Sequence, residues 1–176
     1  MSEGAFEVLK KRGFVSQCSD EEGLRRLLDA SQVTYYIGFD PTASSLHVGN
    51  LLQLFAMSHL QRSGHRPIAL IGAGTCRIGD PSGKTEARPI LPVETINANA
   101  ERFRVQIGRF LDFSEGRGLM EDNAEWLVPL NYIEFLRDIG RHFSVNRMLS
   151  FETYKMRLET GLSFIEFNYQ LSLIHI

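Results

Sequence analysis

The stretch VTYYIGFDPTASSLHVGNLLQLF, residues 33–55, contains two hydrophobic patterns separated by a polar turn. Val33 to Phe39 is rich in β-branched and aromatic residues, which predicts a strand. The residues from Asp40 to Ser45 are typical of a turn. Leu46 to Ser63 then shows apolar residues at helical spacing, which predicts a mostly buried helix with Gly64 at its C-terminal end. The apolar positions of this helix are Val48, Leu51, Leu52, Phe55 and Leu60.

A second strand is predicted from Pro67 to Ala73, where a continuous apolar run is typical of the inside of a parallel sheet. A loop rich in glycine and proline follows, from Gly74 to Pro92. Strand, turn, helix and strand in this order predict an α/β fold with a Rossmann-like parallel sheet and flanking helices. The loops Asp40–His47 and Gly72–Arg88 each follow a predicted strand, so they should begin at the same edge of the parallel sheet. Ligands of such sheets bind at this edge, beyond the carboxyl ends of the strands.

The rest of the sequence predicts further helices. Amphipathic patterns indicate helices near Ala5–Arg12 and from about Asp20 to Ala30, with Ser19 or Asp20 as the cap of the second. A long helix is predicted by the spacing of Ile96, Ala100, Phe103, Ile107 and Phe110. Two or three more helices are expected between Asn131 and Glu159, and Ser163 to Glu166 fits a capping box that begins a last helix.

Composition places the chain among ordinary globular proteins. Its 176 residues are enough for one domain, and 43% of them are hydrophobic. The net charge of −2 indicates that this chain is not the main electrostatic binding surface for RNA, because nucleic-acid-binding proteins usually carry an excess of basic residues. Cys18 and Cys76 are too few for a disulfide framework, and we expect thiols in a reducing cytoplasm. We also expect no secretory signal and no membrane-spanning segment.

The turn after the first strand carries residues suited to a nucleotide. A helix N-terminus favours phosphate, and both His47 and the hydroxyl of Thr42 could donate a hydrogen bond to the same anion. Gly49 leaves room for a flat base. The alternative is that His47 caps its own helix and that Gly49 is merely tolerated.

The glycine-rich second loop matches neither of two common phosphate motifs. A dinucleotide fingerprint fails because Arg77 occupies its third glycine position. A P-loop fails because Gly79 and Gly83 stand too close together, and Pro81 between them has no N–H to donate. A P-loop-like NTPase therefore remains only a weak competitor.

The same loop does contain charged residues that could bind a substrate. Asp80 follows a buried strand and could bind an ammonium group. Lys84 and Arg88 could close over phosphates, although taken alone they are better explained as part of a solvated loop. The histidines other than His47 are scattered, so we expect no metal site made by the protein; they are His59, His65, His142 and His175.

Four segments together resemble one known family. YYIGFDPTA at 35–43, LHVGN at 46–50, GDPSGK at 79–84 and GLSFIEFNY at 161–169 are similar, in order and spacing, to bacterial-type tyrosyl-tRNA synthetases. The resemblance runs from about residue 5 to Leu171 and implies the amino-terminal part of a class I catalytic domain. In the His-x-Gly-His signature of this class the last histidine is replaced by Asn50, which can still bind a ribose hydroxyl.

The resemblance implies a tyrosine–tRNA ligase and a role for each candidate residue. Tyr36 would bind the phenol of the substrate, and the residues implied at its α-ammonium group are Thr75, Asp80 and Tyr169. Those implied around ATP are Asp40, Thr42, His47, Gly49 and Asn50. Lys84 and Arg88 would reach the pyrophosphate. Strand alternation puts Tyr35 and Tyr36 on opposite faces of the strand. Spacing alone does not say which of them faces the pocket, and Tyr36 could equally be an aromatic residue of the core; only the resemblance selects Tyr36.

The implied substrates are L-tyrosine, ATP with Mg²⁺, and tRNA(Tyr). A homodimer is also implied, through the helices around Asn131 to Met148, whose apolar residues could equally be core. In a related alternative, the chain would be a tryptophanyl-tRNA synthetase or another nucleotidyltransferase. Tyr36 with Asp80 and Tyr169 favours tyrosine.

The resemblance ends near the C-terminus. The family has a glutamine and an aspartate where this chain has Leu173 and Ile176, so residues 172–176 read as a tail that departs from the pattern. The second class I signature and the main tRNA-binding regions lie further on in the family. The chain therefore reads as an incomplete catalytic domain, and the alternative is an inactive half-synthetase that serves as a binding or dimerisation module.

Overall fold

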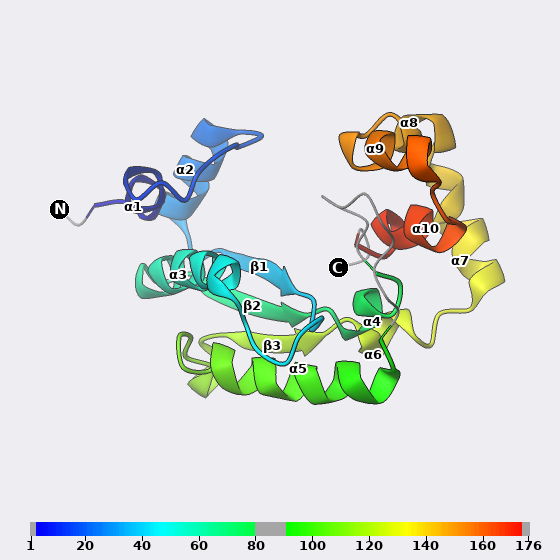
Figure 1. The fold of residues 1–176 in the computed structure, drawn as a ribbon. Coiled ribbons are helices and arrows are strands. Elements are labelled where there is room, and N and C mark those ends of the chain that lie inside the picture. The colour runs from blue at the N-terminus through cyan, green and yellow to red at the C-terminus, as the bar shows by residue number, and fades with distance from the viewer. Residues whose placement is uncertain (1–2, 80–90, 174–176) are drawn as a thin grey trace. The chain divides into compact units, whose positions relative to one another are not determined.

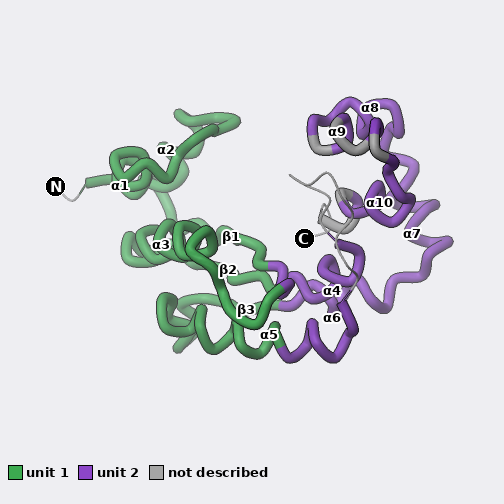
Figure 2. The backbone as a smooth tube through the Cα atoms, viewed as in Figure 1, with its two compact units in different colours: residues 1–39, 43–71, 99–121 green, residues 40–42, 72–98, 122–176 purple. Residues whose placement is uncertain are grey.

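The computed structural model describes residues 3–79 and 91–173, and it divides into two compact units (Figure 2). Unit 1 comprises residues 1–39, 43–71 and 99–121. Unit 2 comprises residues 40–42, 72–98 and 122–176. Each unit is described by itself below.

Unit 1 is built on a sheet of three parallel strands in the order β1-β2-β3 (Figure 1). These strands are β1, Thr34–Phe39, β2, Arg66–Ile71, and β3, Leu119–Asp122, the last residue of which belongs to unit 2. In the β1–β2 pair Thr34 lies opposite Arg66 and Phe39 opposite Ile71. The two strands therefore end side by side, which confirms that the loops after them begin at one edge of the sheet. We did not predict β3, because LMED is short and shows no alternating pattern.

Helices flank this sheet (Figure 1). Those of unit 1 are α1, Ala5–Lys11, α2, Glu21–Ala30, α3, Val48–Arg62, and the larger part of α5, Val93–Ile107; a 3₁₀ turn spans Ser114–Gly116. The predicted cap of α2 is confirmed, since the Asp20 carboxylate accepts a hydrogen bond of 2.8 Å from the Gly23 N–H. α1 packs on α2 and α3, and Ala5, Phe6 and Leu28 form a small core there. Helix α5 ends at Ile107, before the predicted Phe110.

The prediction that α3 is mostly buried was wrong. Leu54 and Met57 are fully buried, but Val48 is 79% exposed, Leu52 61% and Phe55 45%. Helix α3 packs against β1 and β2. Its apolar residues lie around more of the helix than the face that those strands cover, and periodicity alone does not reveal which face is covered.

Unit 2 is helical. Its elements are α4, Ala73–Cys76, the first turns of α5, α6, Ala124–Leu127, α7, Tyr132–Asp138, a 3₁₀ turn at Gly140–His142, α8, Val145–Leu149, α9, Glu152–Thr160, and α10, Phe164–Leu173. Met148, Tyr154 and Leu171 form a core, with Phe135, Phe143, Leu162 and Phe167 packed against it. Within the described residues, no helix combines the length and apolar character needed to cross a bilayer.

Two local predictions in unit 2 had different outcomes. The capping box of α10 is confirmed, because the Glu166 carboxylate accepts hydrogen bonds from the N–H of Ser163 at 3.0 Å and from its hydroxyl at 2.6 Å. The prediction of a loop from Gly74 onward was wrong, since Ala73–Cys76 forms the short helix α4. Gly74 within this segment hid the helix, because glycine is a poor helix former.

Candidate active site

Four residues of unit 2 that are distant in sequence meet in one hydrogen-bonded group, the Asp40 cluster: Asp40, Thr75, Asn123 and Tyr169. One oxygen of the Asp40 carboxylate accepts a hydrogen bond of 2.7 Å from the Thr75 hydroxyl. The other accepts one of 2.9 Å from the Tyr169 hydroxyl. Thr75, Asn123 and Tyr169 are each at most 5% exposed, whereas Asp40 is partly exposed. The cluster thus presents a carboxylate whose position is fixed by buried donors.

Glycines on both sides of Ala73 allow the backbone to approach this cluster closely. A Cβ atom at Gly72 would lie 1.9 Å from an Asp40 carboxylate oxygen and 2.6 Å from the Thr75 hydroxyl oxygen. A Cβ atom at Gly74 would lie 2.9 Å from the side-chain oxygen of Asn123. All three distances are shorter than real Cβ contacts. The glycines therefore serve close packing at Asp40 and Asn123, and not the dinucleotide motif that the sequence superficially suggests.

Asn123 is a member of the cluster that the sequence analysis missed. Its side-chain oxygen accepts hydrogen bonds from the backbone N–H of Gly74 at 2.8 Å and of Thr75 at 3.4 Å. Its amide nitrogen donates to the Thr75 hydroxyl at 3.1 Å. Asn123 thereby binds two consecutive backbone N–H groups of α4 and donates to the Thr75 hydroxyl, which itself donates to Asp40. Asn123 belongs to no recognisable motif. The only signal in the sequence is the pair Asp122 and Asn123, since both residue types are common in turns.

In unit 1 the N-terminus of α3 carries a second group, the His47 cap: His47, Gly49 and Asn50. The His47 ring nitrogen Nδ1 accepts a hydrogen bond of 3.1 Å from the Gly49 N–H. In return, the Asn50 side-chain oxygen accepts one of 3.1 Å from the His47 N–H. This reciprocal pair is a capping box, so the alternative that His47 caps its own helix is confirmed.

The His47 cap also fixes the tautomer of the imidazole. Since Nδ1 accepts a hydrogen bond, the proton of the neutral ring resides on Nε2, an assignment that follows from the hydrogen-bond pattern. The side chain is exposed, so an Nε2–H donor is presented to solvent at a helix N-terminus. A Cβ atom at Gly49 would lie 3.0 Å from His47 Cε1. Gly49 is therefore not merely tolerated, because it makes room for the capping ring.

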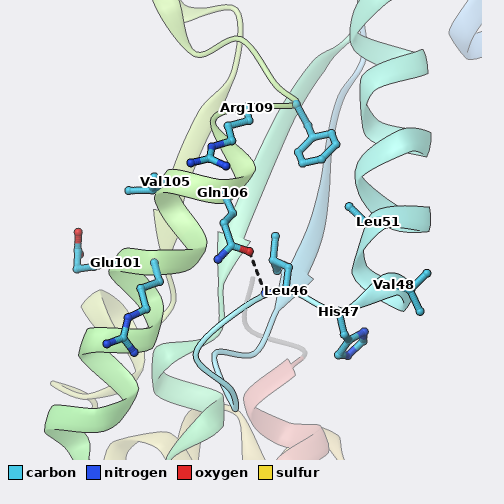
Figure 3. Close-up of a pocket in the computed structure, with 10 residues that line it drawn as sticks. Leu46, His47, Val48, Leu51, Glu101, Val105, Gln106 and Arg109 are labelled. Carbon is cyan, nitrogen blue, oxygen red and sulfur yellow. Dashed lines mark hydrogen bonds between the residues drawn. The ribbon is translucent and has the colours of Figure 1, made fainter.

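A wide groove of about 690 Å³, the α5 groove, borders the His47 cap within unit 1 (Figure 3). Leu46, His47, Val48 and Leu51 line one side of it. Residues from α5 and just beyond line the other side: Glu101, Arg102, Val105, Gln106, Arg109 and Phe110. The two sides are joined by a hydrogen bond of 3.0 Å from the Leu46 N–H to the Gln106 side-chain oxygen.

The two tyrosines of β1 separate as strand alternation requires. Tyr35 is partly buried, and its hydroxyl donates a hydrogen bond of 2.6 Å to the backbone carbonyl of Met57 on α3. Burial raises the pKa of the Tyr35 phenol well above its ordinary value. Tyr36 is 50% exposed and is therefore no core residue. The structure thus excludes core packing as the explanation for Tyr36.

The remaining candidates fall into two groups. Thr42 is exposed, and its backbone N–H donates to the Asp40 carbonyl oxygen at 2.8 Å. Asp80, Lys84 and Arg88 lie outside the described residues. In the described residues, no group of three or more His, Cys, Asp or Glu side chains could hold a metal ion.

The sequence model of the family described as "tRNA synthetases class I (W and Y)" matches residues 28–171. The chain belongs to this family. The match covers both β1 with the His47 cap and α4 with the Asp40 cluster. The Rossmann-like fold expected from the sequence is thereby confirmed, as is the resemblance stated for the four segments.

Relatives within the class I family are tyrosine–tRNA ligases. The chain is 60% identical over 166 residues to that of Caldanaerobacter subterraneus subsp. tengcongensis, and 58% identical over 166 residues to that of Acetivibrio thermocellus. In each comparison 94% of this chain and 41% of the relative are covered. The chain therefore spans about two fifths of the length of these relatives.

A solved structure shows the same fold. The C-terminally truncated mitochondrial tyrosyl-tRNA synthetase of Aspergillus nidulans superposes with a TM-score of 0.86 at 30% sequence identity. The superposition covers 97% of this chain and 52% of that synthetase.

Proposed function

We propose that the protein activates L-tyrosine with ATP, forming tyrosyl-adenylate and pyrophosphate, and then transfers tyrosine to tRNA(Tyr). The observation that carries this proposal is the Asp40 cluster, in which Asp40 accepts hydrogen bonds from Thr75 and Tyr169. Two of these residues, Thr75 and Tyr169, are those expected at the α-ammonium group of tyrosine. The tyrosine-ligase relatives support the choice of substrate.

The chemistry of the Asp40 cluster suits a primary ammonium group. Both carboxylate oxygens of Asp40 accept hydrogen bonds from hydroxyl donors, which orient the carboxylate. An ammonium group has three donors and seeks such acceptors. We place Asp40 beside this group, in addition to its expected place around ATP. The two assignments are compatible, because the tyrosine carboxylate must meet the α-phosphate during activation.

The reaction needs positioning more than proton transfer. A carboxylate oxygen of tyrosine attacks the α-phosphorus of ATP and forms a bond to it. The bond from the α-phosphorus to the bridging oxygen of pyrophosphate breaks, and pyrophosphate leaves. The carboxylate is already a nucleophile, so no general base is required, and catalysis rests on orientation and on stabilising charge that develops on the phosphates. Mg²⁺ enters with ATP as part of the substrate.

The His47 cap supplies such stabilisation in the proposed mechanism. Its Nε2–H points away from the capping bond, and the N-terminus of the fifteen-residue helix α3 adds a partial positive charge. We assign His47 to the phosphates of ATP, with Gly49 and Asn50 beside the nucleoside and Thr42 as a further donor. Donors that are already oriented cost no reorganisation during the reaction.

The remaining roles follow the family expectation. We assign Tyr36 to the phenol of the substrate, Asp80 to its ammonium group, and Lys84 and Arg88 to the pyrophosphate. The 50% exposure of Tyr36 is compatible with contact to a ligand. Rejection of phenylalanine by a site that hydrogen-bonds a phenol is established for this enzyme family.

The function is tested by the tyrosine-dependent exchange of pyrophosphate into ATP, measured on the complete gene product. Tyrosine should support exchange, while phenylalanine and tryptophan should not. Faster exchange with tryptophan than with tyrosine would overturn the choice of substrate within the family. The absence of exchange with every amino acid would overturn the proposed activity itself.

We also propose a homodimer formed through unit 2. A groove of about 330 Å³ there is lined by apolar residues from α6 to α7 and from α10, among them Leu130, Tyr132 and Phe164. Tyr132 and Phe164 are 58% and 68% exposed, and Ile133, the neighbour of Tyr132 in the sequence, is 68% exposed. Exposed apolar side chains of this kind indicate a protein–protein interface. The family resemblance implies that the partner at this surface is a second copy of the chain.

The dimer is tested by sedimentation of Ile133→Glu. This variant should sediment as a monomer, because a charge would be buried without a partner in the interface. Leu27→Glu is the matched control, since Leu27 is 50% exposed on α2 and should leave the dimer intact. A dimeric Ile133→Glu variant would overturn the assigned surface.

A further inference from the structure

The turn that precedes the His47 cap is fixed at one point by a distant side chain. The Leu46 N–H donates a hydrogen bond of 3.0 Å to the side-chain oxygen of Gln106 on α5 (Figure 3). Residues 43–46 make no other hydrogen bond within the described part of the chain. Leu46 immediately precedes His47, so this bond holds the backbone directly before the N-cap residue of α3.

Gln106 acts from a rigid position. It lies between Phe103 and Ile107 on α5, whose side chains are 2% and 0% exposed. Just beyond the helix, Phe110 packs edge to face against Phe55 of α3, with ring centroids 5.9 Å apart. Packed aromatic contacts of this kind fix the distance between α3 and the Gln106 backbone.

Leu46 is joined directly to His47, so a displacement of Leu46 would be transmitted to the His47 backbone and ring. His47 has an extended backbone, with φ −106° and ψ 173°, and its ring returns to the Gly49 N–H over 3.1 Å. If Leu46 moves, the N–H of His47 moves away from Asn50 and the ring turns with it. A ring turned by a small angle no longer directs Nε2–H along the same line.

We propose that Gln106 is a positioning residue for His47: its side-chain oxygen holds Leu46 so that the His47 Nε2–H donor is oriented before the nucleotide binds. The expected effect on catalysis rests on the proposed function. The link from Gln106 through Leu46 to His47 rests on the geometry alone. Gln106 touches no reacting group in this account.

The test compares Gln106→Met with Gln106→Glu in the complete gene product. Methionine keeps the length of the side chain and removes the acceptor, whereas glutamate keeps an acceptor oxygen. Gln106→Met should lower kcat for tyrosine-dependent exchange at least tenfold with KM for tyrosine unchanged, because small misplacements of a catalytic donor carry costs of that size. Gln106→Glu should stay within about threefold of the wild type in kcat.

A matched control comes from the other end of α3. Gln61 also binds backbone of a distant segment, accepting from the Asp112 N–H at 3.0 Å and donating to the Asp112 carbonyl at 2.7 Å. Gln61→Met removes a comparable tether far along the helix from His47. It should lower the midpoint of denaturation and leave kcat unchanged.

Nitrogen NMR of the His47 ring gives a readout that does not depend on activity. The wild type should show the Nε2–H tautomer, and Gln106→Met should show a mixture of tautomers, while Gln61→Met should match the wild type. Unchanged His47 signals and an unchanged kcat in Gln106→Met would overturn the inference and leave Gln106 a structural residue. If the wild type shows no exchange at all, the proposed function fails, and the His47 signals alone then decide the positioning role.

Discussion

The Asp40 cluster and the His47 cap are built in opposite ways. The four members of the cluster come from positions as far apart as Asp40 and Tyr169, and three of them are almost fully buried. The cap is made by residues within one turn of α3, and the His47 and Gly49 positions are exposed. The cluster therefore depends on tertiary packing, while the hydrogen bonds within the cap are local and one tertiary bond, from the Leu46 N–H to Gln106, lies beside it.

This contrast predicts how each group responds to substitution. A buried group whose members satisfy one another loses its geometry when one atom is added or removed, because the neighbours cannot turn to water. A cap on an exposed helix end can lose its side chain at a cost of about 1 kcal/mol in helix stability, because solvent replaces the lost partner. We therefore expect the cluster to be sensitive in both stability and function, and the cap mainly in function.

The largest effect is expected for Gly72→Ala. The added Cβ would collide with the Asp40 carboxylate and the Thr75 hydroxyl, at 1.9 and 2.6 Å. Overpacking of this kind costs about 1–3 kcal/mol of unfolding free energy. Tyrosine-dependent exchange should fall more than about a hundredfold, since Asp40 would be displaced.

Gly38→Ala is the control for that experiment. A Cβ atom at Gly38 meets nothing within 4 Å, so its unfolding free energy should change by less than about 0.5 kcal/mol. Equal destabilisation of the two variants in urea would show that the close approach at Gly72 has no energetic consequence.

A large effect on rate with little effect on stability is expected for His47→Ser. Serine is a good N-cap, so α3 should keep its stability within about 0.5 kcal/mol. The Nε2–H donor is lost, and kcat for tyrosyl-adenylate formation should fall about a hundredfold, which is the usual cost of removing one oriented donor. An unaltered kcat, measured by pre-steady-state quenching, would remove His47 from the mechanism.

A smaller effect distinguishes two buried tyrosines. Tyr169→Phe removes the donor to Asp40, whereas Tyr154→Phe removes a hydroxyl that donates to the Phe167 carbonyl at 2.9 Å. Each variant should lose about 1 kcal/mol of stability. Only Tyr169→Phe should raise KM for tyrosine, by about tenfold. The same KM in both variants would place Tyr169 outside the substrate site.

The smallest effect is a pH dependence from His65, a buried residue of unit 1. Its Nδ1 accepts from the Val33 N–H at 3.3 Å, and burial lowers its pKa, opposed by the negative charge of Asp29. The unfolded chain therefore binds the proton more readily than the folded protein does. The unfolding free energy should be constant above about pH 6.5 and should decrease as the pH falls below that value towards the lowered pKa.

Urea denaturation at pH 7.5 and pH 5.5 checks this dependence. His65→Asn keeps an oxygen acceptor for the Val33 N–H but has no proton to bind in this range. The wild type should lose stability between the two pH values by more than this variant does. If both lose the same amount, other groups govern the acid side of the stability curve.

The difference between the two regions also explains what the sequence could predict. The strand, the turn and the helix of the His47 cap are visible in residues 33–55, because the relevant contacts span only a few positions. The capping role of Asp20 and the capping box at Ser163 and Glu166 were predictable for the same reason. The members Thr75 and Tyr169 of the cluster could be selected only by resemblance, since periodicity gives no information about contacts between distant segments.

What could not be predicted has a physical cause in each instance. Asn123 acts entirely through buried bonds to Gly74 and Thr75, and nothing near it in sequence indicates those partners. The strand β3 is too short for an alternating pattern, and α4 contains a glycine in its four residues. The exposure of Val48 on α3 depends on which faces the fold covers, and apolar spacing does not contain that information.

The most direct test of the account is a calorimetric titration with L-tyrosine and with 3-(4-hydroxyphenyl)propionate, which lacks the ammonium group. The complete gene product and its Asp40→Asn variant would be compared. We expect the wild type to prefer tyrosine strongly, and Asp40→Asn to reduce this preference about tenfold by weakening tyrosine binding alone, as expected for one lost interaction with a charged group. A preference that is unchanged in Asp40→Asn would contradict the assignment of the Asp40 cluster to the ammonium group of tyrosine.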